Sequence, residues 1–223
     1  MTSGLFFQAI LKFILGAAVV GLLIFVPAGT LYFWNAWLFM GILFIPVFFA
    51  GMVMMFKNPE LLKKRLNAKE QQMEQNLVIK LSGLMFVMGF VMAGLNFRFG
   101  WIMLPDWVSR TAAVVFLFSY LLYAEVLREN AYLSRTVEVQ QGQRVIDTGL
   151  YGIVRHPMYS ATIVLFLSMP LVLGSVPSFV IFLAYPVIIA RRIGNEEMVL
   201  EKGLEGYAEY KKTVKYKIIP FIW

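Results

Sequence analysis

The chain has 223 residues, of which 60% are hydrophobic and only 15% are charged, and its formal net charge is +7. Soluble domains are typically about 45–50% apolar and about 25% charged, so this composition indicates a membrane protein. The basic residues lie in short loops between apolar stretches, where they interact with lipid headgroups, and no nucleic-acid partner is expected. With no cysteine and a single histidine, His156, the chain has no thiolate nucleophile and no set of Cys or His metal ligands, and no metal site is expected.

Four apolar stretches reach the length of about 20 residues that a helix needs to cross a bilayer. They are residues 5–27, 31–56, 77–97 and 107–127. Residues 57–76 mix leucines with lysines and predict an amphipathic helix on the membrane surface. After a polar stretch at 128–157, residues 159–173 and 178–190 are short apolar stretches that predict a helical hairpin, and residues 195–213 predict a surface helix with alternating charge.

The fold class predicted from these stretches is an all-α integral membrane protein. It has about five to six transmembrane helices, including the C-terminal helical hairpin, plus amphipathic surface helices. Residues 1–128 form the N-terminal four-helix transmembrane region, and residues 129–223 form a region that carries the hairpin and the candidate site. Together they make one membrane domain.

The distribution of basic residues predicts the orientation. With alternating spans and the N-terminus inside, only Arg98 and Arg110 of the 20 Lys and Arg residues fall on the outer side. Because basic residues concentrate on the cytoplasmic side of membrane proteins, both termini and the polar 128–157 stretch are expected to face the cytoplasm.

Three polar clusters fall on that side: residues 140–151, 155–159 and 191–212. Each has an ordinary structural explanation. Arg155 and His156 can extend to the headgroups from the start of a helix, and Glu196 and Glu197 suit the first turn of a surface helix. Tyr207 and Tyr210 can be interfacial anchors. An acid at Glu125 near the membrane is a functional candidate, although pairing with Arg128 one turn later explains it more simply.

Taken together, the clusters favour a binding site. The hairpin returns the chain to the side where it began, so the Arg155–His156 pair is expected near Arg192 and the acidic pair that follows it. Tyrosines surround both pairs in the sequence. Such a site suits a ligand with both charges and an aromatic ring, because aromatic faces attract cations and arginine binds carboxylates through two parallel hydrogen bonds. A sulfonium cofactor with an amino-acid tail and an adenine has this chemistry.

The order of the motifs resembles a known family. Gly149-x-Tyr151-x-x-x-Arg155-His156-Pro157-x-Tyr159, a short apolar hairpin, Arg192-x-x-x-Glu196-Glu197 and Tyr207-x-x-Tyr210-Lys211-Lys212-x-Val214 follow one another as in the isoprenylcysteine carboxyl methyltransferase family, and most like its prokaryotic members. The resemblance covers residues 129–223, whereas the first four spans are similar only in kind.

This resemblance implies methyl transfer from S-adenosylmethionine inside a membrane. Arg192 is expected to bind the acceptor, and Arg192, Glu197 and Arg155 are the expected catalytic residues. The residues expected to bind the cofactor by motif position are Gln140, Gln143, Arg144, Val145, Ile146, Tyr151, His156, Pro157, Met158, Tyr159 and Glu196. The chain departs from the family at Ala161, where the family usually has glycine, and in a slightly shorter stretch between Glu197 and Tyr207, which leaves the identity of the acceptor open.

The expected reaction is carboxyl O-methylation of a lipidic or isoprenylcysteine-like acceptor, either a small molecule or a prenylated protein terminus. A phospholipid amine or a small thiol is an alternative acceptor, and it would require a base such as Glu197 or His156. NADPH-dependent sterol reductases are similar around the hairpin, but they tend to carry Gly-Glu where this chain has Ala161-Thr162. A transporter or scaffold is the non-enzymatic alternative, although transporters usually show inverted repeats and broken helices at the midplane, and here the unusual residues gather at one surface.

Overall fold

The computed structural model describes residues 3–57, 59, 62–63, 66, 73–130, 132–133 and 139–223. Within these residues, five helices are long and apolar enough to cross a membrane, which confirms the prediction of an all-α integral membrane protein. The elements are α1 (Ser3–Ala28), α2 (Trp34–Lys57), α4 (Met73–Phe99), α5 (Asp106–Glu129), the 3-10 helix η1 (Gly149–Gly152), α6 (Pro157–Val172), α7 (Val176–Phe182), α8 (Ala184–Gly203) and α9 (Tyr207–Thr213). The surface helix predicted at 57–76 falls mostly outside the described residues.

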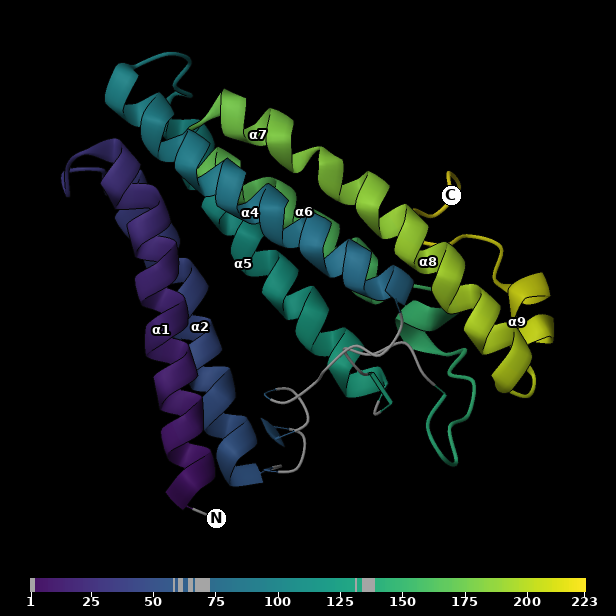
Figure 1. Cartoon of the computed structure of the whole chain (residues 1–223). Helices are drawn as coiled ribbons and strands as arrows, with labels where there is room; N and C mark the ends of the chain where they lie inside the picture. The colour runs from purple at the N-terminus through teal and green to yellow at the C-terminus, as the bar shows by residue number, and fades with distance from the viewer. Residues whose placement is uncertain are drawn as a thin grey trace.

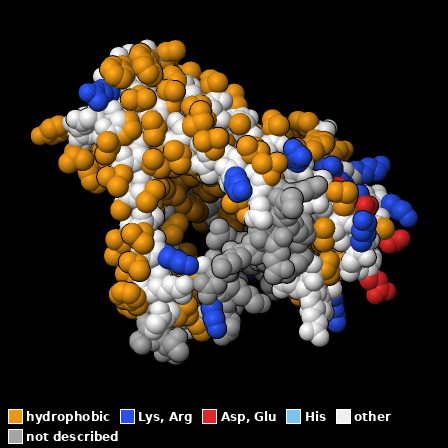
Figure 2. All heavy atoms as spheres, in the orientation of Figure 1, with side chains coloured by type: hydrophobic (Ala, Val, Ile, Leu, Met, Phe, Trp, Pro, Cys, Tyr) orange, Lys and Arg blue, Asp and Glu red, His pale blue; other side chains and the backbone are white. Residues whose placement is uncertain are grey.

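The helices form a pair and a bundle that meet at one end of the molecule. α1 and α2 lie side by side, while α4, α5, α6 and the α7–α8 segment form the bundle (Figure 1). The pair packs against the bundle mainly through α1 and α4, near the end that holds the α1–α2 and α4–α5 turns, and it diverges from the bundle toward α9. Figure 2 shows the surface hollowed between the two groups, with hydrophobic side chains around the hollow.

Two glycines of α4 explain how closely the helices approach. A Cβ atom at Gly94 would overlap the backbone of α1 at Ile24, and one at Gly89 would overlap the ring of Phe182 in α7. Small residues at such crossings let helix backbones pack closely in membranes, where burial of apolar area between helices contributes little. Gly94 thus lets α1 pack closely on one side of α4, and Gly89 lets α7 pack closely on another side.

A buried polar network fixes the turn between α6 and α7. The last carbonyls of α6 have no partner in their own helix, as at any helix end. Asn35 of α2 donates to the Val172 carbonyl at 3.1 Å and to the Ser109 hydroxyl at 2.9 Å, and Ser109 of α5 donates to the Leu171 carbonyl at 3.2 Å. The closed end of the hairpin is thus tied to two other helices, which leaves its open end to form the site.

The second arm of the hairpin differs from the prediction. Residues 178–190 and 195–213 were expected to form two separate elements, but α7 and α8 together make a spanning segment, Val176–Gly203, interrupted only at Leu183. Pro186 in the first turn of α8 accounts for this interruption, because a proline ring clashes with the carbonyl four residues earlier. The single surface helix predicted at 195–213 is therefore wrong: α8 ends at Gly203, Gly206 takes a left-handed conformation with φ of +83°, and only α9 follows.

Candidate active site

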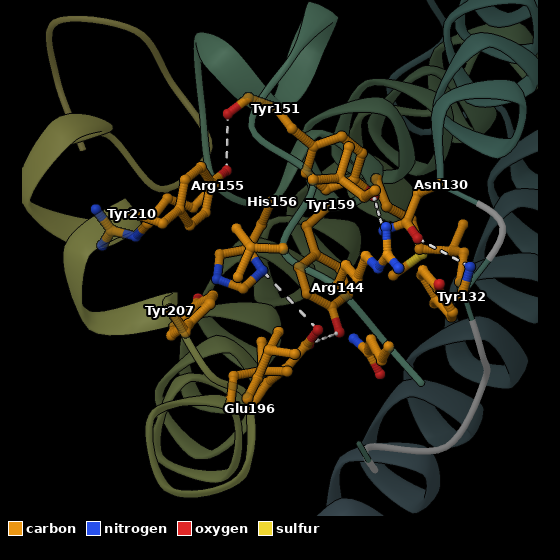
Figure 3. A pocket seen from close by; sticks show the side chains of 17 residues that line it. Asn130, Tyr132, Arg144, Tyr151, Arg155, His156, Tyr159, Glu196, Tyr207 and Tyr210 are labelled. Atoms are coloured by element: carbon orange, nitrogen blue, oxygen red, sulfur yellow. Dashed lines mark hydrogen bonds and ion pairs between the residues drawn. The ribbon is translucent and has the colours of Figure 1, made fainter. Parts of the chain in front are cut away.

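A cavity that is open to solvent lies where α5, η1, the start of α6, α8 and α9 meet (Figure 3). The lining residues are Asn130, Tyr132, Leu133, Gln143, Arg144, Val145, Ile146, Tyr151, Arg155, His156, Met158, Tyr159, Glu196, Leu200, Leu204, Tyr207 and Tyr210. Every one of them comes from the segment between the end of α5 and α9.

Glu129, at the end of α5, places the 3-10 helix that carries Tyr151. Its carboxylate accepts a hydrogen bond from the backbone N–H of Leu150 at 2.9 Å, with the second oxygen at 3.2 Å. Tyr151 is then held at both ends, because Asn130 donates to its hydroxyl at 3.0 Å and Tyr210 donates to its carbonyl at 2.7 Å. Burial raises the pKa of Tyr151 to about 12, so this ring enters the cavity as a neutral phenol.

Gly149 is required at the start of this 3-10 helix. Its φ is +56°, and a Cβ atom there would overlap the Glu129 carboxylate. We expect Gly149→Ala to lower the free energy of unfolding by more than about 2 kcal/mol, because the side chain adds both a left-handed backbone penalty and a clash. Gly142→Ala is the matched control, since Gly142 has a φ of +72° but nothing within 4 Å of its Cβ position, and about 1 kcal/mol is expected there. Chemical unfolding in detergent measures both, and equal losses would contradict the role given to Glu129.

Gln140 and Gln143 have different roles in the loop before η1. Gln143 lines the cavity, and its side-chain oxygen accepts from the Gln140 backbone N–H at 2.9 Å. Gln140 is not among the lining residues. Its side chain donates to the Tyr132 carbonyl at 2.6 Å, while the Tyr132 hydroxyl donates to the Gly142 carbonyl at 3.0 Å. Gln140 therefore holds the loop in place, and Gln143 faces the cavity.

Arg155 fastens the C-terminal segment to the entrance of the hairpin. Its guanidinium donates to Glu197 at 2.7 Å and to the Val214 and Lys215 carbonyls at 2.7 and 2.8 Å. The backbone N–H groups of Arg155 and His156 donate to the carbonyls of residues 216 and 217 at 2.9 and 2.8 Å. The Arg155 side chain is only 5% exposed, so the idea that it extends to the headgroups is wrong.

The two adjacent acids of α8 point to different partners. Glu197 is buried, and besides Arg155 its carboxylate lies 3.3 Å from the His156 ring nitrogen Nε2 and 3.7 Å from Lys211. Glu196 faces the cavity and accepts a hydrogen bond from the Tyr159 hydroxyl at 2.5 Å. Glu196 thus presents charge to the cavity, whereas Glu197 joins α6, α8 and the C-terminal segment behind it.

Arg192 reaches the same tyrosine. Its Nε donates to the Tyr159 hydroxyl at 2.9 Å, so this hydroxyl accepts from Arg192 while it donates to Glu196. Tyr159 lies on α6, and the other two lie one turn apart on α8. The three residues form a connected chain at the open end of the hairpin, between the cavity and the membrane-spanning part of the hairpin.

The structure brings together most of the residues singled out from the motifs. The cavity wall includes Gln143, Arg144, Val145, Ile146, Tyr151, Arg155, His156, Met158, Tyr159 and Glu196. Gln140, Arg192 and Glu197 contact this wall from behind, and Pro157 starts α6 without lining the cavity. Tyr207 and Tyr210 are 4% and 6% exposed, so both are buried in the wall and are not interfacial anchors.

Other lining residues were missed. Those not proposed from the motifs are Asn130, Tyr132, Leu133, Leu200 and Leu204. Leu200 follows Glu196 by four residues, and this helical spacing places both on the same side of α8, whereas Leu204 lies just past the end of the helix. Nothing in the local sequence distinguishes Asn130 and Tyr132. Glu125 pairs with Arg128 at 2.6 Å, as its simpler explanation predicted.

Comparison with known proteins confirms the family resemblance over this part of the chain. Residues 110–202 match the model of the isoprenylcysteine carboxyl methyltransferase (ICMT) family. The matched region runs from α5 through nearly all of α8, so it includes the loop, the hairpin entrance and both acids. This match supports a membrane methyltransferase.

Curated relatives include sterol reductases. The chain is 29% identical over 91 residues to the Delta(14)-sterol reductase TM7SF2 of Mus musculus and 29% identical over 93 residues to a Delta(14)-sterol reductase of Methylotuvimicrobium alcaliphilum, covering 40% of this chain and 22% of each relative. It is 26% identical over 141 residues to a Delta(14)-sterol reductase of Arabidopsis thaliana, covering 56% of this chain and 38% of that protein. The chain thus spans well under half the length of each of these relatives.

Proposed function

We propose that this protein is an S-adenosylmethionine-dependent membrane methyltransferase that esterifies a carboxylate of a lipidic, isoprenylcysteine-like acceptor. The observation that carries the proposal is the connection of a polar cavity to Arg192 through the Tyr159 hydroxyl at the open end of an apolar hairpin. A water-soluble cofactor and a lipid-borne carboxylate can approach this point from opposite directions. The ICMT family match over residues 110–202 supports the same reading.

The cavity wall fits the proposed cofactor. Glu196 and His156 can contact the charged amino-acid part of the cofactor, and Arg144 can bind a carboxylate of that part. The tyrosine faces attract the positive centre of the cofactor. The wall also contains a buried hydroxyl, that of Tyr207, which has no hydrogen-bond partner in the described part of the chain. The residues proposed to hold the cofactor are Gln143, Arg144, Val145, Ile146, Tyr151, His156, Met158, Tyr159 and Glu196, with Gln140 and Pro157 shaping the loop and helix that carry them. When bound, S-adenosylmethionine supplies an electrophilic methyl group.

The protein's own task is to position the acceptor and exclude water. A carboxylate is already ionised at neutral pH, so the protein does not need to remove a proton from it. Arg192 orients the carboxylate, and its hydrogen bond to Tyr159 sets the plane of the guanidinium. Correct alignment of the reacting groups is worth several kcal/mol of the barrier in such reactions. Arg155 and Glu197 act as positioning residues, because they hold the hairpin entrance against the C-terminal segment.

We further infer that this site faces the cytoplasm and that residues 129–223 form the catalytic region, supported by residues 1–128. Every cavity residue lies between 130 and 210. Arg98 packs against Gly29, and the Arg110 guanidinium lies 5.9 Å from the centre of the Trp34 ring, so these two cations are at the end opposite α9 (Figure 1). The other described basic residues gather toward the site end, as the positive-inside rule requires of a cytoplasmic face.

A labelled methyl group tests the reaction type. Detergent-purified protein is incubated with methyl-labelled S-adenosylmethionine and either an S-farnesylated cysteine derivative with a free carboxylate or its methyl ester. We expect transfer to the free acid only, with label released as volatile methanol by mild base, because esters hydrolyse under conditions where methylamines and thioethers do not. Base-stable label on a phospholipid amine or a small thiol would instead support the alternative acceptors, and Glu197 or His156 would then be tested as the base.

The sterol reductase alternative rests on the curated relatives. At the position after Ala161, where an acid is expected in those enzymes, Thr162 accepts a hydrogen bond from the Tyr185 hydroxyl at 3.1 Å. This hydroxyl pair occupies the space between α6 and α8 without a carboxylate. We therefore expect no NADPH turnover with a sterol substrate, and reduction of a Δ14 double bond by the purified protein would favour the reductase.

A further inference from the structure

Tyr207 and Tyr210 differ in one respect that bears on ligand binding. They lie three residues apart on α9, both line the cavity, and their ring centres are 5.7 Å apart. The Tyr210 hydroxyl donates to the Tyr151 carbonyl at 2.7 Å. The Tyr207 hydroxyl is completely buried, yet among the described residues it is the one buried side-chain polar atom without a hydrogen-bond partner.

An unpartnered hydroxyl in this position is unfavourable for the protein alone. Burial of a hydroxyl removes its hydrogen bonds with water, and buried polar groups in folded proteins almost always regain a partner. In Figure 3 the Tyr207 side chain lies near His156 in the cavity wall, and no interaction is drawn to its hydroxyl. Because the Tyr207 side chain lines the cavity, a group that enters the cavity can become this partner once a small shift of the ring uncovers the hydroxyl.

The surroundings determine what kind of group this is. Burial, together with the carboxylates of Glu197 and Glu196, raises the pKa of Tyr207 well above its ordinary value, so the hydroxyl keeps its proton and acts as a donor. Arg155, Lys211 and Lys217 offset the charge of Glu197, whereas Glu196, which lines the cavity, disfavours a second carboxylate beside it. A neutral acceptor, such as a ribose oxygen or a ring nitrogen of adenine, fits better than a carboxylate.

We propose that Tyr207 is a cofactor-binding residue whose hydroxyl donates a hydrogen bond to the nucleoside half of the bound nucleoside–amino acid. This proposal rests on the function proposed above. It assigns Tyr207 a role that the motif positions did not, and it separates this residue from Tyr210. Tyr210 supports the wall through Tyr151, whereas Tyr207 completes its hydrogen bonding only when ligand is present.

Tyr207→Phe and Tyr210→Phe are matched variants, because each removes one hydroxyl from the same helix and leaves the ring. Calorimetric titration with S-adenosylhomocysteine and with 5′-methylthioadenosine, which lacks the amino-acid part, measures affinity. Thermal unfolding without ligand measures stability. We expect Tyr207→Phe to weaken both ligands by about 5- to 10-fold, the loss of one hydrogen bond, with an unfolding temperature that is unchanged or higher. Tyr210→Phe should lower the unfolding temperature without ligand by a few degrees.

The outcomes distinguish the two proposals. If the wild-type protein binds neither ligand, the proposed function fails. If the wild type binds both and Tyr207→Phe binds them equally well, the role of Tyr207 is overturned, and a water molecule is the partner of its hydroxyl. If the variant weakens only S-adenosylhomocysteine, the assignment to the nucleoside half is overturned. A lower unfolding temperature of ligand-free Tyr207→Phe also contradicts the proposal, because it would reveal a partner within the protein.

Discussion

Arg192→Ala is expected to lower the methyl-transfer rate by about 100- to 1,000-fold, comparable to the loss of a well-placed donor at other active sites. The arginine is proposed to orient the acceptor carboxylate, and alanine removes every donor that does so. Affinity for S-adenosylhomocysteine should change by less than about threefold, because the hydrogen bond from Tyr159 to Glu196 does not depend on Arg192. Steady-state rates and calorimetric titration of the same preparation measure the two effects.

Arg191→Ala is the matched control for this prediction. It removes the same charge from the adjacent position of α8, but Arg191 is exposed and lies about 100° around the helix from Arg192. Its rate should stay near that of the wild type. Arg192→Lys should recover part of the rate at most, since lysine keeps the charge but not the planar pair of donors. Equal losses in Arg191→Ala and Arg192→Ala, or lost cofactor binding in Arg192→Ala, would remove Arg192 from its proposed role.

Glu197→Ala is expected to have the largest effect on stability, a loss of about 3–5 kcal/mol in the free energy of unfolding. The Glu197 side chain is 7% exposed, and its carboxylate is the acidic partner of the buried Arg155 guanidinium. Lys211 and Lys217 each lie 3.7 Å from the second oxygen. Removal of the carboxylate leaves a buried cation without a counter-charge, and it separates α8 from the C-terminal segment. Chemical unfolding in detergent measures the loss.

Glu201 provides the control one turn further along α8. It also pairs with Lys211, at 2.7 Å, but its side chain is 42% exposed. Exposed pairs contribute little, so Glu201→Ala should cost less than about 1 kcal/mol. Replacing both buried partners, as Arg155→Met with Glu197→Leu, should recover much of the stability lost in Glu197→Ala. A loss in Glu197→Ala no larger than in Glu201→Ala would show that Glu197 is not structural and would return it to the candidates for a catalytic base.

The sequence predicts those parts of the fold that local physics determines. The lengths of the apolar stretches were enough to predict α1, α2, α4 and α5, since a span needs a fixed number of residues. The continuation of α8 beyond residue 190 was not predictable from hydropathy. Glu196 and Glu197 belong to a spanning helix, and Glu197 is tolerated in a buried position by its ion pair with Arg155, which comes from a distant part of the chain.

The candidate site likewise contains residues that the sequence predicts and residues that only the folded structure reveals. Residues in the motifs, such as Tyr151, His156 and Glu196, were placed in the wall because the hairpin must return to its starting side. Asn130 and Tyr132 could not be found in this way, because they reach the cavity through contacts with Tyr151 and with the Gly142 carbonyl that only the folded loop creates. The partnerless hydroxyl of Tyr207 is likewise a property of the packed structure.

The most direct test of the central claim is calorimetric titration of detergent-purified protein with S-adenosylhomocysteine, with NADPH titrated in parallel. The account predicts a dissociation constant for S-adenosylhomocysteine on the order of micromolar, which corresponds to about −8 kcal/mol, and no heat of binding for NADPH. Binding of NADPH without S-adenosylhomocysteine would contradict the account and favour a reductase.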